Sequence, residues 1–400
     1  MILIENGKLI SMADDNDAEN TFGNSFGEKT IENGYVVIRK DKIIYAGYDE
    51  VKVKEIFSSN NKDKSIIIDA GGGYIFPGMI DAHCHIGLFD EGESEEGKDG
   101  NESTDAITPH LRAIDGIYHD DRSFEDAYKA GITTVVTGPG SANVIGGQFA
   151  ALKTFGRCVD EMILKTPVAM KFAFGENPKK EYANSKKMPK TRMGTAAILR
   201  ETLVKAVNYC SNSSRMEFDI KLNELEKVIT GALPVKIHAH RTDDILTAIR
   251  IANEFNLNFT IEHCSEGHLI KDLLKEKNIK VIVGPLMLNR EKPELRNIDI
   301  KMPGILEKAG IDIAIMSDHP CIPVQDLMIS VQKAYKEGLS AKMALKSVTV
   351  NAAEFCGISD RVGSIEPGKD ADIVIFDKHP LDFYSEVKYT IINGKVVYQK

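Results

Sequence analysis

Two histidines separated by a single residue, His83 and His85, stand at the end of the apolar stretch that begins at Gly73. The stretch predicts a short β-strand. Side chains two residues apart on a strand point to the same side, so both imidazoles are expected to face one way. Imidazole is the commonest protein ligand for zinc and similar divalent ions. A metal site is one interpretation of the pair, and a polar strand-to-loop corner is the other.

Further side chains that can bind metals close three more predicted strands. His238 ends a strand that begins at Pro234, His263 follows one that ends at Glu262, and Asp318 follows one that ends at Met316. A single buried histidine at a strand end is more often a hydrogen-bonded core residue than a ligand. Four histidines and an aspartate at the ends of four strands favour a metal centre, because α/β barrels carry their catalytic residues there.

Alternating strand and helix patterns between residues 73 and 358 supply the elements that would position these side chains. The first strand runs over 73–85, and the others are predicted at 132–137, 149–155, 168–174, 234–238, 258–262, 280–283 and 312–316. Eight strands joined mostly by helices imply parallel strands and an α/β fold of the (β/α)₈ TIM-barrel type. A doubly wound open sheet is the alternative, but no Gly-x-Gly-x-x-Gly follows a strand.

The two ends of the chain have a different pattern. Residues 1–72 and 359–400 contain short strands rich in β-branched residues, and Asn393-Gly394 is a hairpin signal. Neither end is long enough for a stable sheet alone. We therefore expect the ends to pair into one small β-sandwich domain, with the barrel of residues 73–358 inserted between them.

Composition excludes several other classes of protein. The chain is 42% hydrophobic and 27% charged, and no apolar run approaches the ~20 residues of a membrane helix. A net charge of −9 argues against nucleic acid as a partner, because phosphate binding needs a basic face. The six cysteines form no Cys-x-x-Cys pair and the N-terminus lacks a signal-peptide pattern. We expect a cytoplasmic protein with a small-molecule partner, and a homo-oligomer is compatible with such a barrel.

Taken together, these residues resemble the metal-dependent amidohydrolase superfamily. The resemblance covers nearly the whole chain and rests on the Pro77–Asp81 segment before the two histidines, on the strand-end residues, and on the tail from Val362 to Asp372. The imidazolonepropionase and dipeptidase branch is the most similar. The resemblance implies that His83 and His85 bind one divalent ion with Asp318. His238 and His263 would bind a second ion, or one of them would contribute to a mononuclear site. Zinc is expected, with iron, manganese or nickel as alternatives.

A two-metal site of this superfamily also has a bridging anion from about the fourth strand. The sequence offers Lys171, as a carboxylated lysine, and Glu176, as a bridging glutamate. These positions differ by an odd number, so a regular strand cannot direct both inward. We prefer Glu176 as the bridge.

The implied reaction is hydrolysis of an amide, cyclic amide or peptide-like C–N bond by a metal-activated hydroxide. A divalent ion lowers the pKa of water towards 7, and Asp318 would act as general acid and base with His263 beside it. The candidate substrate contacts are His110 and Arg112 in the loop after the first strand, His240 and Arg241 after the fifth, and His268 after the sixth.

Two other functions remain open at this point. A deaminase acting on a nucleobase-like ring would use the same chemistry at an amidine carbon. A non-catalytic scaffold of the same fold would be expected to have lost some ligands, whereas His83, His85, His238, His263 and Asp318 are all present.

Overall fold

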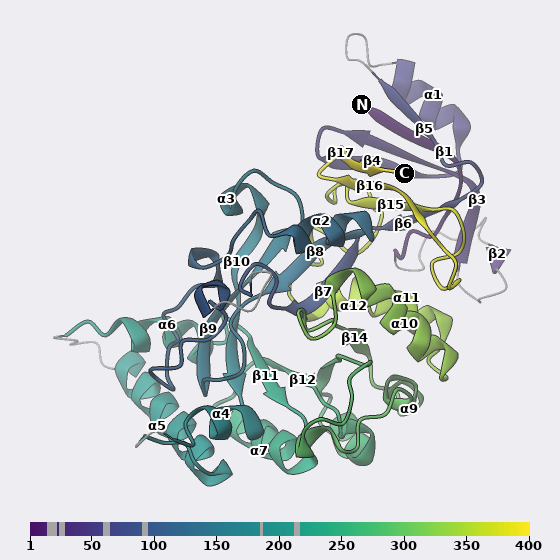
Figure 1. The fold of residues 1–400 in the computed structure, drawn as a ribbon. Helices are drawn as coiled ribbons and strands as arrows, with labels where there is room; N and C mark the ends of the chain where they lie inside the picture. Colours follow the sequence, from purple (N-terminus) through teal and green to yellow (C-terminus); the bar gives the residue numbers. More distant parts are fainter. Residues whose placement is uncertain (14–21, 24–28, 59–64, 90–94, 185–186, 212–216) are drawn as a thin grey trace.

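The computed structural model describes residues 1–13, 22–23, 29–58, 65–89, 95–184, 187–211 and 217–400. These residues form two β-sheets, one in the middle of the chain and one built from its two ends (Figure 1). None of the helices in this part of the chain combines the length and the apolar character that crossing a membrane requires.

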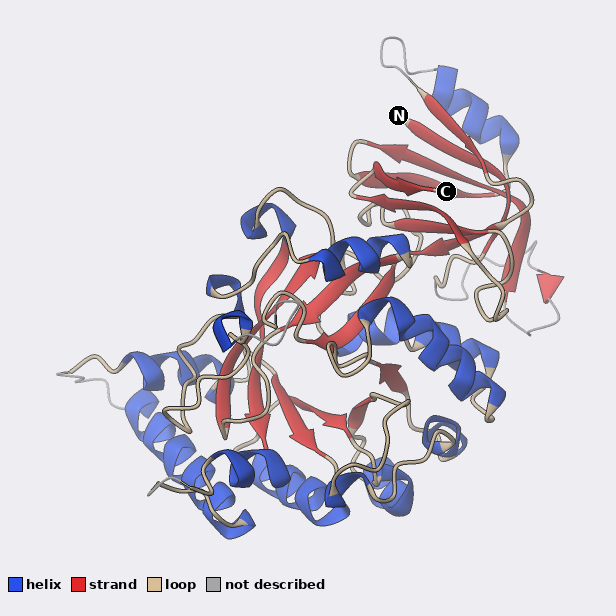
Figure 2. Ribbon diagram, viewed as in Figure 1, coloured by secondary structure: helices blue, strands red, loops and turns tan. Residues whose placement is uncertain are grey.

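The central sheet has eight strands in the order β14-β13-β12-β11-β10-β9-β8-β7 and is nearly closed into a barrel. Helices surround it as an outer layer (Figure 2). Every residue of β7 and β8 is buried, as expected for strands covered on both faces. The strands are β7 (Met79–Cys84), β8 (Ile132–Thr137), β9 (Ile145–Lys153), β10 (Ile163–Ala173), β11 (Val235–Ala239), β12 (Phe259–His263), β13 (Lys280–Val283) and β14 (Ile313–Ile315).

One strand runs against the expected direction. β9 pairs antiparallel with both β8 and β10, so the prediction of eight parallel strands is wrong here. The physical reason is the length of the β8–β9 connection, residues 138–144. A parallel crossover needs about a dozen or more residues, so this short loop can only return the chain as a hairpin.

The seam of the barrel lies between the first and last strands of the order. The segment after β14 closes it: the backbone N–H of Asp318 donates to the carbonyl of His83 at 3.1 Å, and that of His85 donates to the carbonyl of His319 at 2.9 Å. These bonds fix Asp318 beside the two histidines of the first strand.

The helices of the outer layer begin with side-chain caps in several cases. The carboxylates of Asp121 and Asp219 accept backbone N–H groups at the start of α2 and α6. The helices are α2 (Arg122–Lys129), α3 (Val159–Met162), α4 (Glu176–Glu181), α5 (Arg192–Ser211), α6 (Ile220–Ile229), α7 (Thr242–Glu254), α8 (Lys271–Glu276), α9 (Met302–Lys308), α10 (Leu327–Lys336), α11 (Ala341–Lys346) and α12 (Val350–Phe355).

The second sheet joins the two ends of the chain, and both termini lie on it (Figure 1). The order is β17-β16-β15-β6-β1-β3-β2, with β4 on β3 and β5 on β1. Helix α1 (Glu50–Ser58) contributes Val53 to a cluster with Leu3 and Val37 of the sheet. The strands are β1 (Ile2–Leu9), β2 (Phe22–Gly23), β3 (Lys29–Arg39), β4 (Lys42–Gly47), β5 (Ile66–Asp69), β6 (Tyr74–Pro77), β15 (Ile373–Phe376), β16 (Val387–Ile392) and β17 (Lys395–Gln399).

The pairing of the two ends agrees with the sequence prediction. The hairpin between β16 and β17 turns at Asn393 and Gly394, whose φ angles are 48° and 69°. Left-handed backbone at both positions is what an Asn-Gly turn supplies. The closing of this sheet into a sandwich, and the division of the chain after residues 72 and 358, stay predictions.

The predicted strand over residues 73–85 is two strands. β6 belongs to the sheet of the chain ends and β7 to the barrel, with the change at Gly78. A Cβ atom at Gly78 would collide with Thr133, so a glycine is required there. Because β6 and the start of β7 form one apolar run, the sequence pattern does not reveal the change of sheet.

A buried ionic cluster links the two sheets. The carboxylate of Asp370 forms ion pairs with Nζ of Lys42 on β4 at 2.6 Å and with Nζ of Lys153 on β9 at 3.0 Å. It also forms a bidentate pair with Arg361. The Asp370 side chain is fully buried. A buried carboxylate needs oppositely charged partners, and Lys42, Lys153 and Arg361 are those partners for Asp370.

Candidate metal centre

The strand-end residues lie together at one mouth of the barrel. His83 is in β7 and His238 in β11, with His85 and His240 one position beyond these strands. His263 ends β12, and Asp318 follows β14. All are buried, with exposed fractions of 8% or less. His263 and Asp318 have left-handed backbone, with φ angles of 68° and 54°. Such conformations are uncommon for residues other than glycine and cluster at functional sites.

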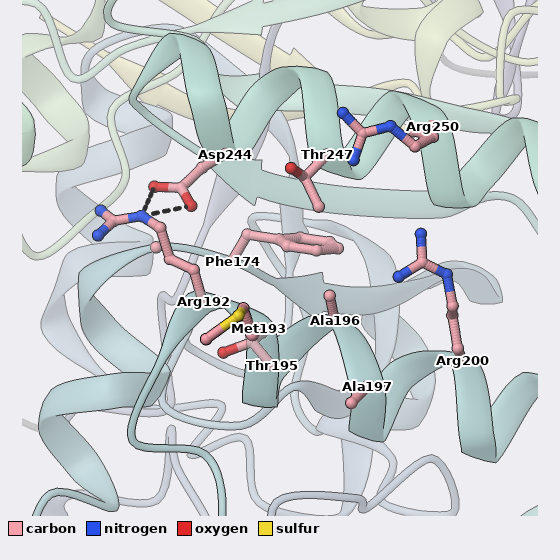
Figure 3. A pocket seen from close by; sticks show the side chains of 11 residues that line it. Phe174, Arg192, Met193, Thr195, Ala196, Ala197, Arg200, Asp244, Thr247 and Arg250 are labelled. Carbon is pink, nitrogen blue, oxygen red and sulfur yellow. Dashed lines mark hydrogen bonds and ion pairs between the residues drawn. The ribbon is translucent and has the colours of Figure 1, made fainter.

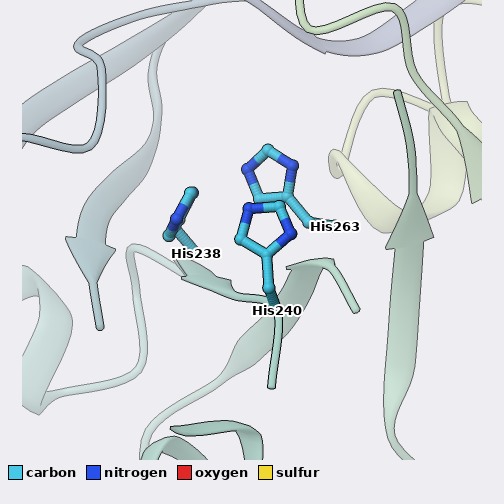
Figure 4. Close-up of side chains that lie close together, drawn as sticks. All are labelled: His238, His240 and His263. Carbon is cyan, nitrogen blue, oxygen red and sulfur yellow. The ribbon is translucent and has the colours of Figure 1, made fainter. Parts of the chain in front are cut away.

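Two groups of side chains have the spacing of metal ligands. Ligand atoms of His238, His240 and His263 lie within 4.8 Å of one another, and those of His83, His263 and Asp318 do so as well. Figure 4 shows the three histidine rings of the first group directed towards one another. His263 belongs to both groups, and His85 adjoins the second through Nε2, 3.2 Å from Oδ1 of Asp318. The two groups therefore form one continuous centre.

The Nδ1 atom of each of these histidines already has a partner. For His83, His85 and His263 the partner is a carboxylate or carbonyl oxygen, which must accept a hydrogen from Nδ1 and so leaves Nε2 with its lone pair for a metal. A serine hydroxyl accepts a hydrogen from Nδ1 in the same way when His238 or His240 carries its hydrogen there. The partners are the Glu262 carboxylate for His83 (2.7 Å), the Gly138 carbonyl for His85 (2.6 Å), the Ser141 hydroxyl for His238 (2.9 Å), the Ser265 hydroxyl for His240 (2.8 Å) and the Gly284 carbonyl for His263 (2.9 Å).

The Nε2 atom of His263 tests whether these residues fit a metal ion. It is buried, and no described residue forms a hydrogen bond with it. A buried polar atom without a partner costs about 1–3 kcal/mol. A cation at the point where the two groups meet would remove that cost, so the residues fit the ion.

Protonation also agrees with metal binding. Burial lowers the pKa of His83, His238 and His240 well below the usual range and lowers that of His263 to about 4. Neutral imidazole is the form that binds metals. Burial raises the pKa of Asp318, but His263 and His85 lower it further, so it lies below its ordinary value and the carboxylate is ionised.

Of the two candidates for the bridge, the structure brings Lys171 to the histidines. Lys171 is fully buried on β10, with Nζ 3.0 Å from Nε2 of His83, and burial lowers its pKa to about 8. Glu176 begins α4 and belongs to neither ligand group among the described residues. The left-handed backbone of Gly175 (φ 88°) directs the chain into that helix. The contacts favour Lys171, but which of the two residues forms the bridge stays a prediction.

Comparison with known proteins decides the family. Residues 74–397 match the amidohydrolase family. The chain belongs to the amidohydrolase family. The crystal structure of an amidohydrolase from Thermotoga maritima MSB8 has 38% sequence identity and a TM-score of 0.89, and the match covers 100% of both chains.

Curated relatives agree with this membership. Imidazolonepropionase from Fusobacterium nucleatum is 25% identical, and the match covers 92% of both chains. Amidohydrolase tasK from Hapsidospora irregularis is 27% identical over 81% of this chain, but the chain spans only 36% of that relative's length.

The remaining predicted site residues of this amidohydrolase differ in their surroundings. His240, expected to contact substrate, is one of the three clustered histidines. Arg241 forms a bidentate pair with Asp243, both bonds measuring 3.0 Å. Arg112 lies 3.9 Å from Glu224 and is half exposed.

His110 and His268 belong to neither ligand group in the described part of the chain. Each has a buried Nδ1 atom without a hydrogen-bond partner there. Substrate contact by either residue, or by Arg112 or Arg241, stays a prediction.

Sequence reasoning did not assign a role to Glu262, which orients His83. The carboxylate of Glu262 also forms an ion pair with Nζ of Lys236 at 3.2 Å and accepts a hydrogen bond from the hydroxyl of Thr260. The signal was available, because Thr260 and Glu262 are polar, alternate with the apolar residues Phe259 and Ile261, and share one side of the strand. Two polar residues of equal parity on a buried strand indicate an interior polar network.

Glu294 is a second residue that the sequence did not indicate. It lies between β13 and α9, in a turn over Pro293–Leu295, and is 1% exposed. Burial raises its pKa. Its Oε1 atom lies 3.8 Å from Nε2 of His240. Only the folded structure brings this loop residue to the histidines.

A cleft of about 450 Å³ lies between α5 and α7, and Figure 3 shows its lining. Phe174 and Gly175 at the end of β10 border it, and Arg192 donates to Asp244 across one end at 2.9 Å and 3.1 Å. None of the clustered histidines lines this cleft.

Proposed function

We propose that this amidohydrolase is a metal-dependent hydrolase that cleaves a C–N bond of an amide, cyclic amide or peptide-like substrate. The observation that carries the proposal is the position of His263, which belongs to both ligand groups and whose buried Nε2 atom forms no hydrogen bond with any residue that the structure describes. His83, His85 and Asp318 would hold one divalent ion, and His238, His240 and His263 a second. Lys171 is the bridge candidate that the geometry favours.

A divalent ion held there supplies Lewis-acid chemistry, because it acidifies water and polarises a carbonyl oxygen. The chain's own residues perform the remaining tasks. The ionised carboxylate of Asp318 accepts the proton of the attacking water and returns it to the leaving nitrogen. Glu262 holds the ring of His83 in one orientation, and Ser265 does the same for His240.

Two findings support a substrate with a C–N bond that is cleaved. The chain belongs to the amidohydrolase family, and its relatives include an imidazolonepropionase matched over 92% of both chains. An imidazolonepropionate is a cyclic amide. Cyclic amides are therefore the first substrate class to examine, and dipeptides are the second.

The experiment measures zinc per chain and hydrolysis of imidazolonepropionate, a dipeptide panel, adenosine and guanine. Wild-type protein, His263→Asn and the control His119→Asn, at a half-buried histidine outside both ligand groups, are compared. We expect one or two zinc ions in the wild type, at least one fewer in His263→Asn, and unchanged content in the control. Hydrolysis of the amides should follow zinc content. Release of ammonia from adenosine or guanine alone would favour the deaminase, and zinc-free inactive protein would favour the scaffold.

A further inference from the structure

The carboxylate of Glu294 is only half satisfied. Oε2 accepts the backbone N–H of Glu176 at 3.0 Å, whereas Oε1 is buried and has no hydrogen-bond partner among the described residues. A buried carboxylate oxygen without a donor is expensive, because desolvation is not compensated. A group that binds beside it is expected to supply the donor.

The nearest cationic side chain does not supply it. Nζ of Lys292 lies 3.7 Å from Oε1 and donates to the side-chain oxygen of Asn177 at 3.1 Å instead. Nε2 of His240 is 3.8 Å away. Both separations exceed the 2.7–3.2 Å of an N–H···O hydrogen bond. Oε1 of Glu294 thus lies near the three-histidine group but too far from it for a direct hydrogen bond.

The charges around Gly175 favour a cation as the missing donor. A Cβ atom at Gly175 would lie 3.0 Å from Oε2 of Glu294 and 3.2 Å from Oδ2 of Asp244, so two carboxylates meet at this glycine. Asp244 is neutralised by the short bonds from Arg192. Glu294 has no equivalent pair at hydrogen-bond distance among the described residues. A metal ion is a poorer fit, because Glu294 does not meet the mutual spacing of either ligand group.

We propose that Glu294 determines substrate specificity, and that its Oε1 atom accepts a hydrogen bond from an ammonium group of an amide substrate bound at the histidines. The inference rests on the proposed function and names its substrate class: amides that also carry a protonated amine. A charge-assisted bond in a water-poor site would give both affinity and orientation.

The test uses matched amides that differ only by an ammonium group: β-alaninamide with propanamide, 4-aminobutanamide with butanamide, and 6-aminohexanamide with hexanamide. Binding to zinc-loaded protein is measured by titration calorimetry at pH 7.5. In the wild type, at least one amine should bind tenfold more tightly than its neutral partner. Glu294→Gln should reduce this preference to within twofold while zinc content stays unchanged. Glu291→Gln, an exposed carboxylate in the same loop, should keep it.

Three results would overturn the proposal: no preference in the wild type, a preference that survives Glu294→Gln, or loss of zinc in that variant, which would make Glu294 a ligand. If Glu294→Gln does not fold, Glu294→Asp replaces it and should lower the preference at least threefold. Binding is read without turnover. Absence of zinc-dependent hydrolysis by the wild type would therefore contradict the proposed function separately from this inference.

Discussion

The Nζ atom of Lys171 lies 3.0 Å from the Nε2 atom of His83, although the two residues come from β10 and β7. Both side chains are fully buried. A lysine placed against a metal-binding nitrogen cannot remain a fully charged ammonium when a cation binds, because the two charges repel. Burial lowers the pKa of Lys171 to about 8, so the neutral amine forms readily near physiological pH.

Replacing Lys171 should therefore change metal content, and replacing Glu176 should not. Lys171→Met keeps the volume but removes the amine, and we expect it to lose at least one of the bound ions because the bridge is absent. Glu176→Gln should retain the wild-type number, since Glu176 lies on α4 outside both ligand groups. Elemental analysis of protein purified without chelators measures both. Equal loss in the two variants would restore Glu176 as a candidate bridge.

Asp318→Asn should reduce turnover about 10²–10⁴-fold, because the amide cannot accept the proton of water. The measurement is kcat on whichever amide the wild type hydrolyses. Asp312→Asn makes the same substitution at an exposed position just before β14 and should leave kcat unchanged. Turnover of Asp318→Asn within tenfold of wild type would exclude Asp318 as general acid and base.

Glu262→Gln should weaken zinc affinity about 10–100-fold, because His83 loses the anion that orients its ring. Competition with a chromophoric chelator measures the affinity. The substitution also leaves Lys236 buried without its charge partner, which lowers stability by itself. Adding Lys236→Met should restore stability but not zinc affinity. Recovery of both in the double variant would show that Glu262 acts through folding alone.

The buried cluster at Asp370 predicts a pH dependence of stability. Burial raises the pKa of Asp370, but Arg361, Lys153 and Lys42 lower it further, to about 2. Because the pKa in the folded state is below the ordinary value of about 3.9, the stabilisation is fully present above about pH 4 and is lost as the pH falls towards 2. Asp370→Asn should lower the free energy of unfolding by about 1.5–3 kcal/mol at pH 7.

Urea unfolding of wild type and Asp370→Asn at pH 7, 4 and 3 measures this difference, which should shrink below pH 4. Asp360→Asn, an exposed neighbour, should follow the wild type throughout. A difference that stays constant down to pH 3 would contradict the assigned pKa.

Much of the barrel was predictable because its strands are short apolar runs that end in metal-binding side chains. His83, His238 and His263 stand at strand ends in the sequence and in the structure. The direction of β9 was not recognised, although the short connection before it implies a hairpin. Pattern alone indicates a strand but not the path of the chain between strands.

The finer parts of the site depend on geometry that sequence spacing does not contain. Spacing predicts that a regular strand cannot direct both Lys171 and Glu176 inward, but only the structure shows that Lys171 lies 3.0 Å from His83 while Glu176 begins α4 after Gly175. Glu294 lies 3.8 Å from His240 only because the fold brings the turn over Pro293–Leu295 to the histidines. Long-range contacts of this kind arise from the tertiary fold rather than from local propensity.

Barrel enzymes usually diversify by altering the loops after their strands. In this chain one connection has little freedom to vary, because the hairpin loop over 138–144 supplies the Gly138 carbonyl to His85 and the Ser141 hydroxyl to His238. An insertion there would disturb a ligand in each half of the centre at once. Divergence of substrate range within such a lineage is therefore expected in the other connections, while the length of this loop stays constant.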